Sequence, residues 1–110
     1  MTDIQQLPEA LRIFIDATNA GDSEAFVAAF SPDAHLNDWG HEFHGRSGVA
    51  QWNRSDNIGV QAHFDLVSAA PGPQDGTYRL TLKVSGNGYN GTGPMVFELR
   101  DGLIASLRIS

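Results

Sequence analysis

The spacing of apolar residues changes once along the chain, near residue 57, and this change limits the possible folds more than any other feature. Before it, apolar residues recur every three or four positions, as on one face of a helix. After it, they alternate with polar residues, as along a half-buried strand. Helices followed by a run of strands predict an α+β fold. With 110 residues and no repeat or internal linker, we expect a single domain spanning 1–110.

The first half of the chain predicts three helices. The first ends near a glycine, and its buried face is formed by five residues: Leu7, Leu11, Phe14, Ile15 and Thr18. Asp22 suits the N-cap of the second helix, which should end at Ser31 because the residue before a proline avoids helical geometry. Two short extended segments, 34–38 and 41–44, then precede a third helix at 47–57. On that helix, polar residues are expected on a solvated face: Asn53, Arg54 and Asp56.

The second half predicts antiparallel strands joined by turns. Period-two alternation covers 58–66, 78–84, 95–99 and the final strand at 103–109. The glycine-rich segment 86–93 predicts the turn between the second and third of these strands. We therefore expect a long antiparallel meander after the helices.

Composition excludes several classes of partner and site. The net charge of −6 is a poor match to phosphate backbones and anionic lipids, so we expect no nucleic-acid and no membrane partner. The chain has no cysteine, which excludes disulfides, thiolate metal sites and cysteine nucleophiles. No apolar stretch approaches the ~20 residues that span a bilayer, and the N-terminal residues lack the pattern of a signal peptide. We expect a soluble cytoplasmic protein.

Two adjacent segments carry a resemblance to a known family. They read NAGDSEAFVAAFSPDAHLNDWG at 19–40 and FHGRSGVAQW at 43–52. In order and spacing they resemble the NTF2-like superfamily, the group of nuclear transport factor 2, ketosteroid isomerase and SnoaL-like polyketide cyclases. The resemblance covers nearly the whole chain. It implies a cone-shaped fold, with three N-terminal helices packed on a strongly curved antiparallel sheet around a pocket, and usually a homodimer.

The likeness to ketosteroid isomerase extends to one of three catalytic positions. The isomerase places its catalytic base at the end of the first short strand, where this chain has Asp38. Its oxyanion tyrosine on the first helix falls on Phe14, and its aspartic acid on a late strand falls on Met95. Losing one oxyanion donor typically costs ~100- to 1,000-fold in rate, so we do not expect a faithful isomerase.

Asp38 is the main candidate for chemistry. It shares a strand face with Leu36, so it should point toward an apolar interior, where a carboxylate loses hydration and suits a general base or acid. Alternatively, it is a turn aspartate that bonds local backbone amides before Trp39. His41 follows across a tight turn, where it either assists Asp38 or faces solvent as an ordinary strand histidine.

The remaining histidines give no metal site in the sequence. His41 and His44 are three apart, and on a strand odd spacing places side chains on opposite faces, so we expect no metal. His63 and Asp65 share a strand face that could line a pocket, face solvent or meet a dimer partner. The large apolar residues expected to form both the core and a ligand-binding wall are Phe14, Trp39, Trp52, Met95 and Phe97.

These observations support a functional hypothesis and two alternatives. The hypothesis is a small SnoaL-like enzyme that acts by general acid/base proton transfer on an apolar small-molecule substrate, as an isomerase, cyclase or dehydratase. Asp38 would be the base and His41 would polarise a substrate oxygen; proton transfer needs no cofactor. The alternatives are a non-catalytic module that binds a small molecule, and a protein–protein interaction module. Mixed polar outer faces on the late strands suggest a homodimer.

Overall fold

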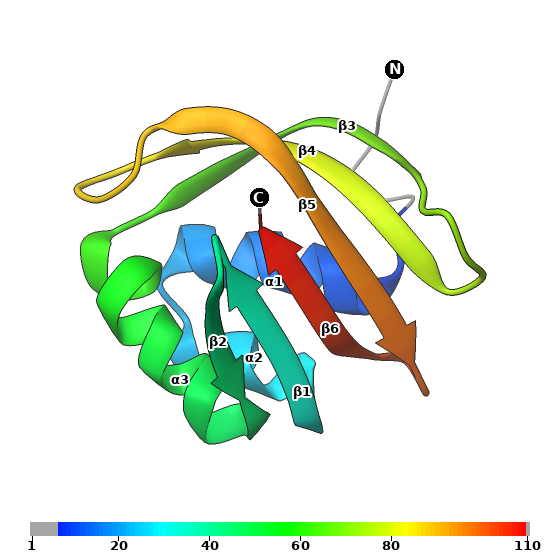
Figure 1. Ribbon diagram of the computed structural model, residues 1–110. Coiled ribbons are helices and arrows are strands. Elements are labelled where there is room, and N and C mark those ends of the chain that lie inside the picture. The colour runs from blue at the N-terminus through cyan, green and yellow to red at the C-terminus, as the bar shows by residue number, and fades with distance from the viewer. Residues whose placement is uncertain (1–6, 110) are drawn as a thin grey trace.

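The structure is a computed structural model that describes residues 7–109. Its helices are α1 (Glu9–Ala20), α2 (Ser23–Ala28) and α3 (Gly45–Asp56), followed by a 3₁₀ turn, η2 (Ile58–Val60). Its strands are β1 (Phe30–Asp38), β2 (His41–His44), β3 (His63–Pro71), β4 (Thr77–Ser85), β5 (Gly91–Arg100) and β6 (Leu103–Ile109). They form one six-stranded sheet in the order β2-β1-β6-β5-β4-β3, with the helices on one side of it (Figure 1). Within 7–109, no helix is long and apolar enough to cross a membrane.

The sheet differs from the expected one in two respects. The predicted meander of β3 to β6 is confirmed, because each of these strands is antiparallel to the next. However, β1 pairs with β6 in parallel, so the sheet is mixed and not wholly antiparallel. The sheet also bends without curling as strongly as expected (Figure 1). Beyond β1 the sheet is short, because β2 has only four residues before Gly45 begins α3.

The end of the second helix was predicted wrongly. Asp22 does cap α2, accepting a hydrogen bond from the backbone N–H of Ala25, but the helix ends at Ala28. Phe30 is already the first residue of β1 and pairs with Ile104 of β6. Its ring is fully buried, so long-range pairing and burial outweigh the local helical pattern here.

The start of the third predicted strand was also wrong. The chain turns before entering β3, because the carbonyl of Asn57 accepts hydrogen bonds from the backbone N–H groups of Val60 and Ala62. Gln61 adopts a left-handed conformation with φ of 57°. Gly59 lies so close to the backbone of Arg54 that a Cβ would stand 1.5 Å from its carbonyl oxygen, so a side chain does not fit there.

The core lies between the helices and the sheet and is rich in phenylalanine. The Phe14 ring on α1 stacks on Phe64 of β3 at a centroid distance of 5.2 Å and meets Phe97 of β5 edge-on at 5.0 Å. The Asn19 side chain then fastens the end of α1 to β3. Its Nδ2 donates to the Phe64 carbonyl over 2.9 Å, and its Oδ1 accepts from the Phe64 N–H over 2.7 Å. Phe64 is therefore held in place from both its ring and its backbone.

Candidate active site

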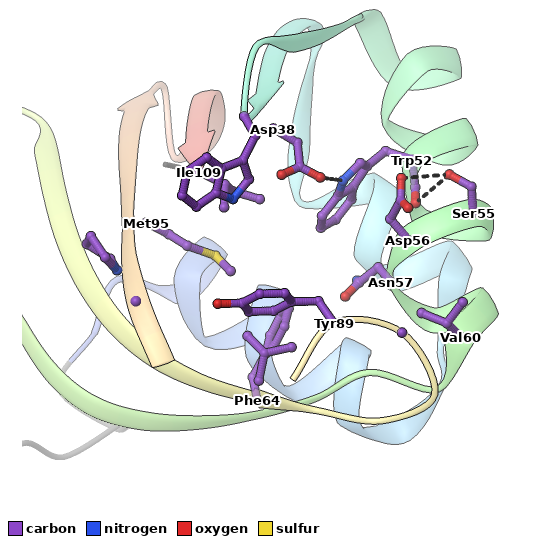
Figure 2. Close-up of a pocket in the computed structure, with 15 residues that line it drawn as sticks. Asp38, Trp52, Ser55, Asp56, Asn57, Val60, Phe64, Tyr89, Met95 and Ile109 are labelled. Carbon is purple, nitrogen blue, oxygen red and sulfur yellow. Dashed lines mark hydrogen bonds between the residues drawn. The ribbon is translucent and has the colours of Figure 1, made fainter. Parts of the chain in front are cut away.

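A cavity of about 250 Å³ opens between α3 and the sheet (Figure 2). Most of its wall is apolar, and its residues come from α3, η2, the adjoining turns and five strands: β1, β3, β4, β5 and β6. Its large apolar residues are Trp52, Val60, Phe64, Val84, Met95 and Ile109, together with Trp39 and Tyr89 from neighbouring turns. Apolar walls with a few polar groups are typical of sites for small organic molecules.

Asp38 stands at the wall of this cavity, at the end of β1. The indole Nε1 of Trp52 on α3 donates to the Asp38 Oδ2 over 3.0 Å (Figure 2). Asn37, which precedes Asp38, stabilises the turn after β1. Its Oδ1 accepts a hydrogen bond from the backbone N–H of Gly40 over 2.9 Å. Asn37 therefore makes the turn hydrogen bond that was the alternative role for Asp38. The Asp38 carboxylate instead bonds to Trp52 at the cavity wall.

Trp52 is held so that only its polar edge faces Asp38. The side chain is 3% exposed, and its ring stacks on Phe26 of α2 at a centroid distance of 6.1 Å. A buried indole N–H needs an acceptor, and the Asp38 carboxylate is the acceptor it finds. The carboxylate oxygen Oδ2 is thereby fixed, while the half-buried group keeps its second oxygen for other contacts.

Asn57, just after α3, is a polar wall residue that the sequence analysis did not select. Its side chain is 1% exposed, and its Nδ2 donates to Thr18 Oγ1 over 3.0 Å and to Asn53 Oδ1 over 3.1 Å. The amide cannot be turned over, because its oxygen would then face the Asn53 oxygen. Asn53 is itself fixed, since its Oδ1 also accepts a hydrogen bond from the backbone N–H of Ile58 over 3.3 Å, and a backbone N–H can only donate.

Among residues 7–109, this network leaves the Asn57 Oδ1 buried without a hydrogen-bond partner. Figure 2 shows it directed into the space between Trp52 and Tyr89. A buried acceptor without a partner is costly, so a donor from a ligand would be favourable there. Asn53, expected on a solvated face of the third helix, is also 1% exposed. Both asparagines could have been found from their spacing, because Asn53 and Asn57 continue the i, i+4 row that begins at the buried Val49.

The interior of the cavity offers acceptors and few donors. Three of the lining residues carry oxygen acceptors: Asp38, Asp56 and Asn57. The hydroxyl of Ser55 is already bonded to Asp56 Oδ2 over 2.9 Å, and the Trp52 N–H is bonded to Asp38. The Tyr89 hydroxyl is a further donor of the wall, and Figure 2 shows it near Met95. This wall therefore suits a ligand that brings O–H or N–H groups for the oxygens and an acceptor for the Tyr89 hydroxyl.

Comparison with known proteins identifies the family. The model of the SnoaL-like domain family matches residues 11–107. The chain belongs to the SnoaL-like family. None of the curated proteins matches it in sequence. The resemblance to the NTF2-like superfamily predicted from residues 19–52 is confirmed.

Solved structures share the fold of this SnoaL-like domain at low sequence identity. A candidate polyketide cyclase from Sinorhizobium meliloti is 24% identical over 99% of this chain and 100% of its own, with a TM-score of 0.88. Rv0760c from Mycobacterium tuberculosis, solved with estradiol-17β-hemisuccinate, is 16% identical over 90% of this chain and 88% of its own, with a TM-score of 0.78. A Δ5-3-ketosteroid isomerase from Mycobacterium sp. is 18% identical over 90% and 87%, with a TM-score of 0.75.

The structure brings some of the predicted site residues of the SnoaL-like domain together. Trp39, Trp52 and Met95 line the cavity with Asp38. Phe14 and Phe97 do not: both are fully buried in the core, where the Phe14 ring packs against both Phe64 and Phe97. Neither Phe14 nor Met95 carries a hydrogen-bond donor, so the two oxyanion positions of the isomerase are apolar here. The catalytic and binding roles of these residues remain predictions.

Unlike Asp38, neither His41 nor His63 lines the cavity. His41 is the cross-strand partner of Asp38, but its side chain is exposed and is not part of the cavity wall. His63 and Asp65, whose facing the sequence left open, are exposed and lie 3.3 Å apart, His63 Nε2 to Asp65 Oδ1. None of these groups extends the polar set around Asp38.

Proposed function

We propose that this SnoaL-like domain binds a small molecule with an apolar body and catalyses a proton transfer in which Asp38 is the general base or acid. The supporting observation is the placement of the Asp38 carboxylate, which the Trp52 indole orients at the wall of an apolar cavity. A positioned carboxylate typically contributes ~100- to 10,000-fold to such a transfer. Isomerisation, cyclisation and dehydration all begin with a step of this kind, and none needs a cofactor for it.

In this proposal each wall residue has a distinct role. Asp38 takes a proton from the substrate and returns it to another atom, so the carboxylate is regenerated at the end of the turnover. Trp52 holds one carboxylate oxygen, which leaves the other to face the reacting carbon. Asn57 accepts a hydrogen bond from a substrate hydroxyl or N–H group. His41 has no part in the proposal, because its side chain is outside the wall.

The relatives support an apolar, ring-containing ligand. Rv0760c was solved in complex with estradiol-17β-hemisuccinate, and another related fold was designed to bind 17-OHP. The cavity of this chain suits such a ligand, because its wall is mainly aromatic and aliphatic and carries a small number of oxygens. We therefore infer a ligand with a rigid apolar skeleton and at least one hydroxyl or N–H group.

A binding module without catalysis is the second candidate. It is favoured by one observation, the apolar side chains at Phe14 and Met95, because an enolate formed in the cavity would lack the two donors that the isomerase uses. Under this reading the cavity holds the same class of ligand, but Asp38 only anchors it.

Hydrogen–deuterium exchange separates the two candidates. Ring-containing ketones that carry a hydroxyl group are incubated with the protein in deuterated buffer, and loss of the proton next to the carbonyl is followed by NMR. Three proteins are compared: wild type, Asp38→Asn and Asp56→Asn. The last is the matched control, since Asp56 is a second carboxylate at the same wall. Binding is followed in parallel by the fluorescence of Trp39 and Trp52.

The proposal predicts exchange with wild type and Asp56→Asn, and a loss of at least ~100-fold with Asp38→Asn while binding persists. Exchange that survives in Asp38→Asn would refute Asp38 as the base. Binding by all three proteins, with no exchange for any ketone, would favour the binding module instead.

A further inference from the structure

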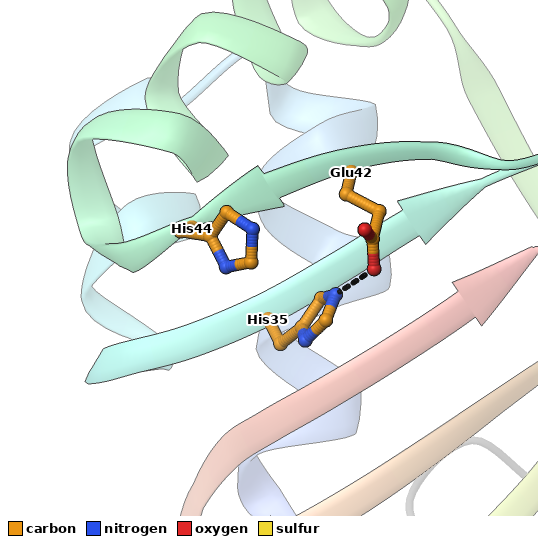
Figure 3. Close-up of side chains that lie close together, drawn as sticks. All are labelled: His35, Glu42 and His44. Carbon is orange, nitrogen blue, oxygen red and sulfur yellow. Dashed lines mark hydrogen bonds and ion pairs between the residues drawn. The ribbon is translucent and has the colours of Figure 1, made fainter.

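Three side chains of the kind that bind transition metals meet on the face of β1 and β2 that points away from the core. They are His35 on β1 and Glu42 and His44 on β2, and one ligand atom from each lies within 4.8 Å of the others. Figure 3 shows all three directed toward one another. His35 Nε2 and Glu42 Oε1 are 2.8 Å apart, and the two imidazole rings have a centroid distance of 4.7 Å.

The backbone fixes this arrangement. Trp39 and Gly40 both have positive φ, 53° and 91°, which is the pattern of a two-residue hairpin turn. This turn sets the register of the hairpin, with Asp38 opposite His41 and His35 opposite His44. Glu42 is two residues from His44 and so shares its face. The opposite face carries Leu36 beside Phe43, so a one-residue slip would bring buried Leu36 to the surface.

We propose that His35, Glu42 and His44 form a binding site for a divalent transition-metal cation, with Zn²⁺ as the best-suited ion. Two imidazoles and one carboxylate are a well-known zinc ligand set, and it leaves the fourth position for water. Ligand atoms around tetrahedral zinc are about 3.3 Å apart. The 2.8 Å pair and the 4.8 Å limit bracket that value, and all three side chains are partly or fully exposed and free to adjust.

The metal would take the place of the hydrogen bond between His35 Nε2 and Glu42 Oε1. No residue from another part of the fold has to move to complete this set of three ligands. The site is independent of the cavity, because β1 alternates its side chains and Asp38 lies on the face opposite to His35. The expectation of no metal was based on His41 and His44, which do lie on opposite faces; the third ligand comes from the neighbouring strand.

Calorimetric titration of the chelator-treated full chain with zinc chloride tests the proposal. We expect saturable binding of one Zn²⁺ per chain, weakened at least about tenfold by His44→Gln and by Glu42→Gln. Two matched controls should bind as wild type does. His41→Gln removes a histidine from the same strand but the other face, and His63→Gln removes a histidine paired with the exposed Asp65.

A second measurement needs no variant. In the NMR spectrum of the wild-type imidazoles, zinc should shift the ring nitrogens of His35 and His44 and leave those of His41 and His63 unchanged. Absence of saturable binding, equal weakening by His41→Gln or His63→Gln, or shifts confined to the other two histidines would each overturn the site.

Discussion

The indole N–H of Trp52 donates to the carboxylate of Asp38 over 3.0 Å, joining the middle of α3 to the end of β1. Within the part of the chain that the structure describes, 7–109, this bond fixes the only carboxylate that stands at the end of a strand within the cavity wall. It also gives a buried indole its partner. The bond therefore connects the stability of the fold to the orientation of the proposed base, and the two effects can be measured separately.

Trp52→Phe should destabilise the protein by roughly 1–3 kcal/mol, because it removes a hydrogen bond to a charged group and part of a buried ring. The bond itself is isolated by a double-mutant cycle with Asp38→Leu, measured by urea denaturation. We expect a coupling free energy of about 1 kcal/mol between the two positions. Strictly additive effects would show that the pair contributes nothing beyond packing.

Asn19→Ala should cost roughly 1–3 kcal/mol of unfolding free energy, because it leaves both backbone groups of the buried Phe64 without their partner. The matched control is Asn90→Ala, since Asn90 also bonds backbone groups, the carbonyls of Gly86 and Gly88, but in an exposed turn. The control should change stability by less than about 0.5 kcal/mol. Equal decreases in unfolding free energy for both variants would mean that the bonds between Asn19 and Phe64 stabilise the fold no more than an exposed turn does.

Trp39→Asn should raise stability by roughly 0.5–1 kcal/mol while weakening ligand binding. Trp39 is 69% exposed and adopts a left-handed φ of 53°, a conformation that suits asparagine far better than a bulky ring. Its ring lines the cavity, so the strain is placed where a ligand would use the side chain. Thermal melting measures the first effect. Fluorescence of the remaining Trp52 measures the second, and unchanged affinity would remove Trp39 from the site.

We also predict a homodimer, assembled through the outer face of the late strands. Mixed polar residues cover that face of β4, with Thr77, Arg79, Thr81 and Lys83 partly or fully exposed. Sedimentation at micromolar concentration should give a species of twice the chain mass of 11.9 kDa. Lys83→Glu, which reverses a charge at one end of this row, should shift the protein toward the monomer. A wild type that sediments only as a monomer would contradict this assembly.

Local patterns in the sequence predict much of this architecture. The period of apolar residues located the helices and the late strands, and the spacing of Leu36 and Asp38 placed both on the inner face. What local patterns do not determine is pairing between distant segments. Phe30 continues the helical pattern of α2, yet it enters β1 because Ile104, far along the chain, pairs with it. The parallel contact of β1 with β6 has the same origin.

The candidate site shows the same division. Asn37 and Asp38 are adjacent, and either can accept a hydrogen bond in a turn; the structure assigns the turn to Asn37 because β1 directs the other side chain inward. Asn57 depends on a network with Thr18, which is 39 residues away. His35 and His44 meet through the register of a hairpin, which the two-residue turn at Trp39 and Gly40 could have indicated.

The most direct test of the central claim is a crystal structure of the protein with a ligand found in the exchange experiment. The account predicts that the ligand occupies the cavity, with its exchanging carbon about 3–3.5 Å from an Asp38 carboxylate oxygen and a hydroxyl or N–H group donating to Asn57 Oδ1. A ligand bound elsewhere on the molecule, or one in the cavity whose exchanging carbon lies out of reach of Asp38, would contradict it.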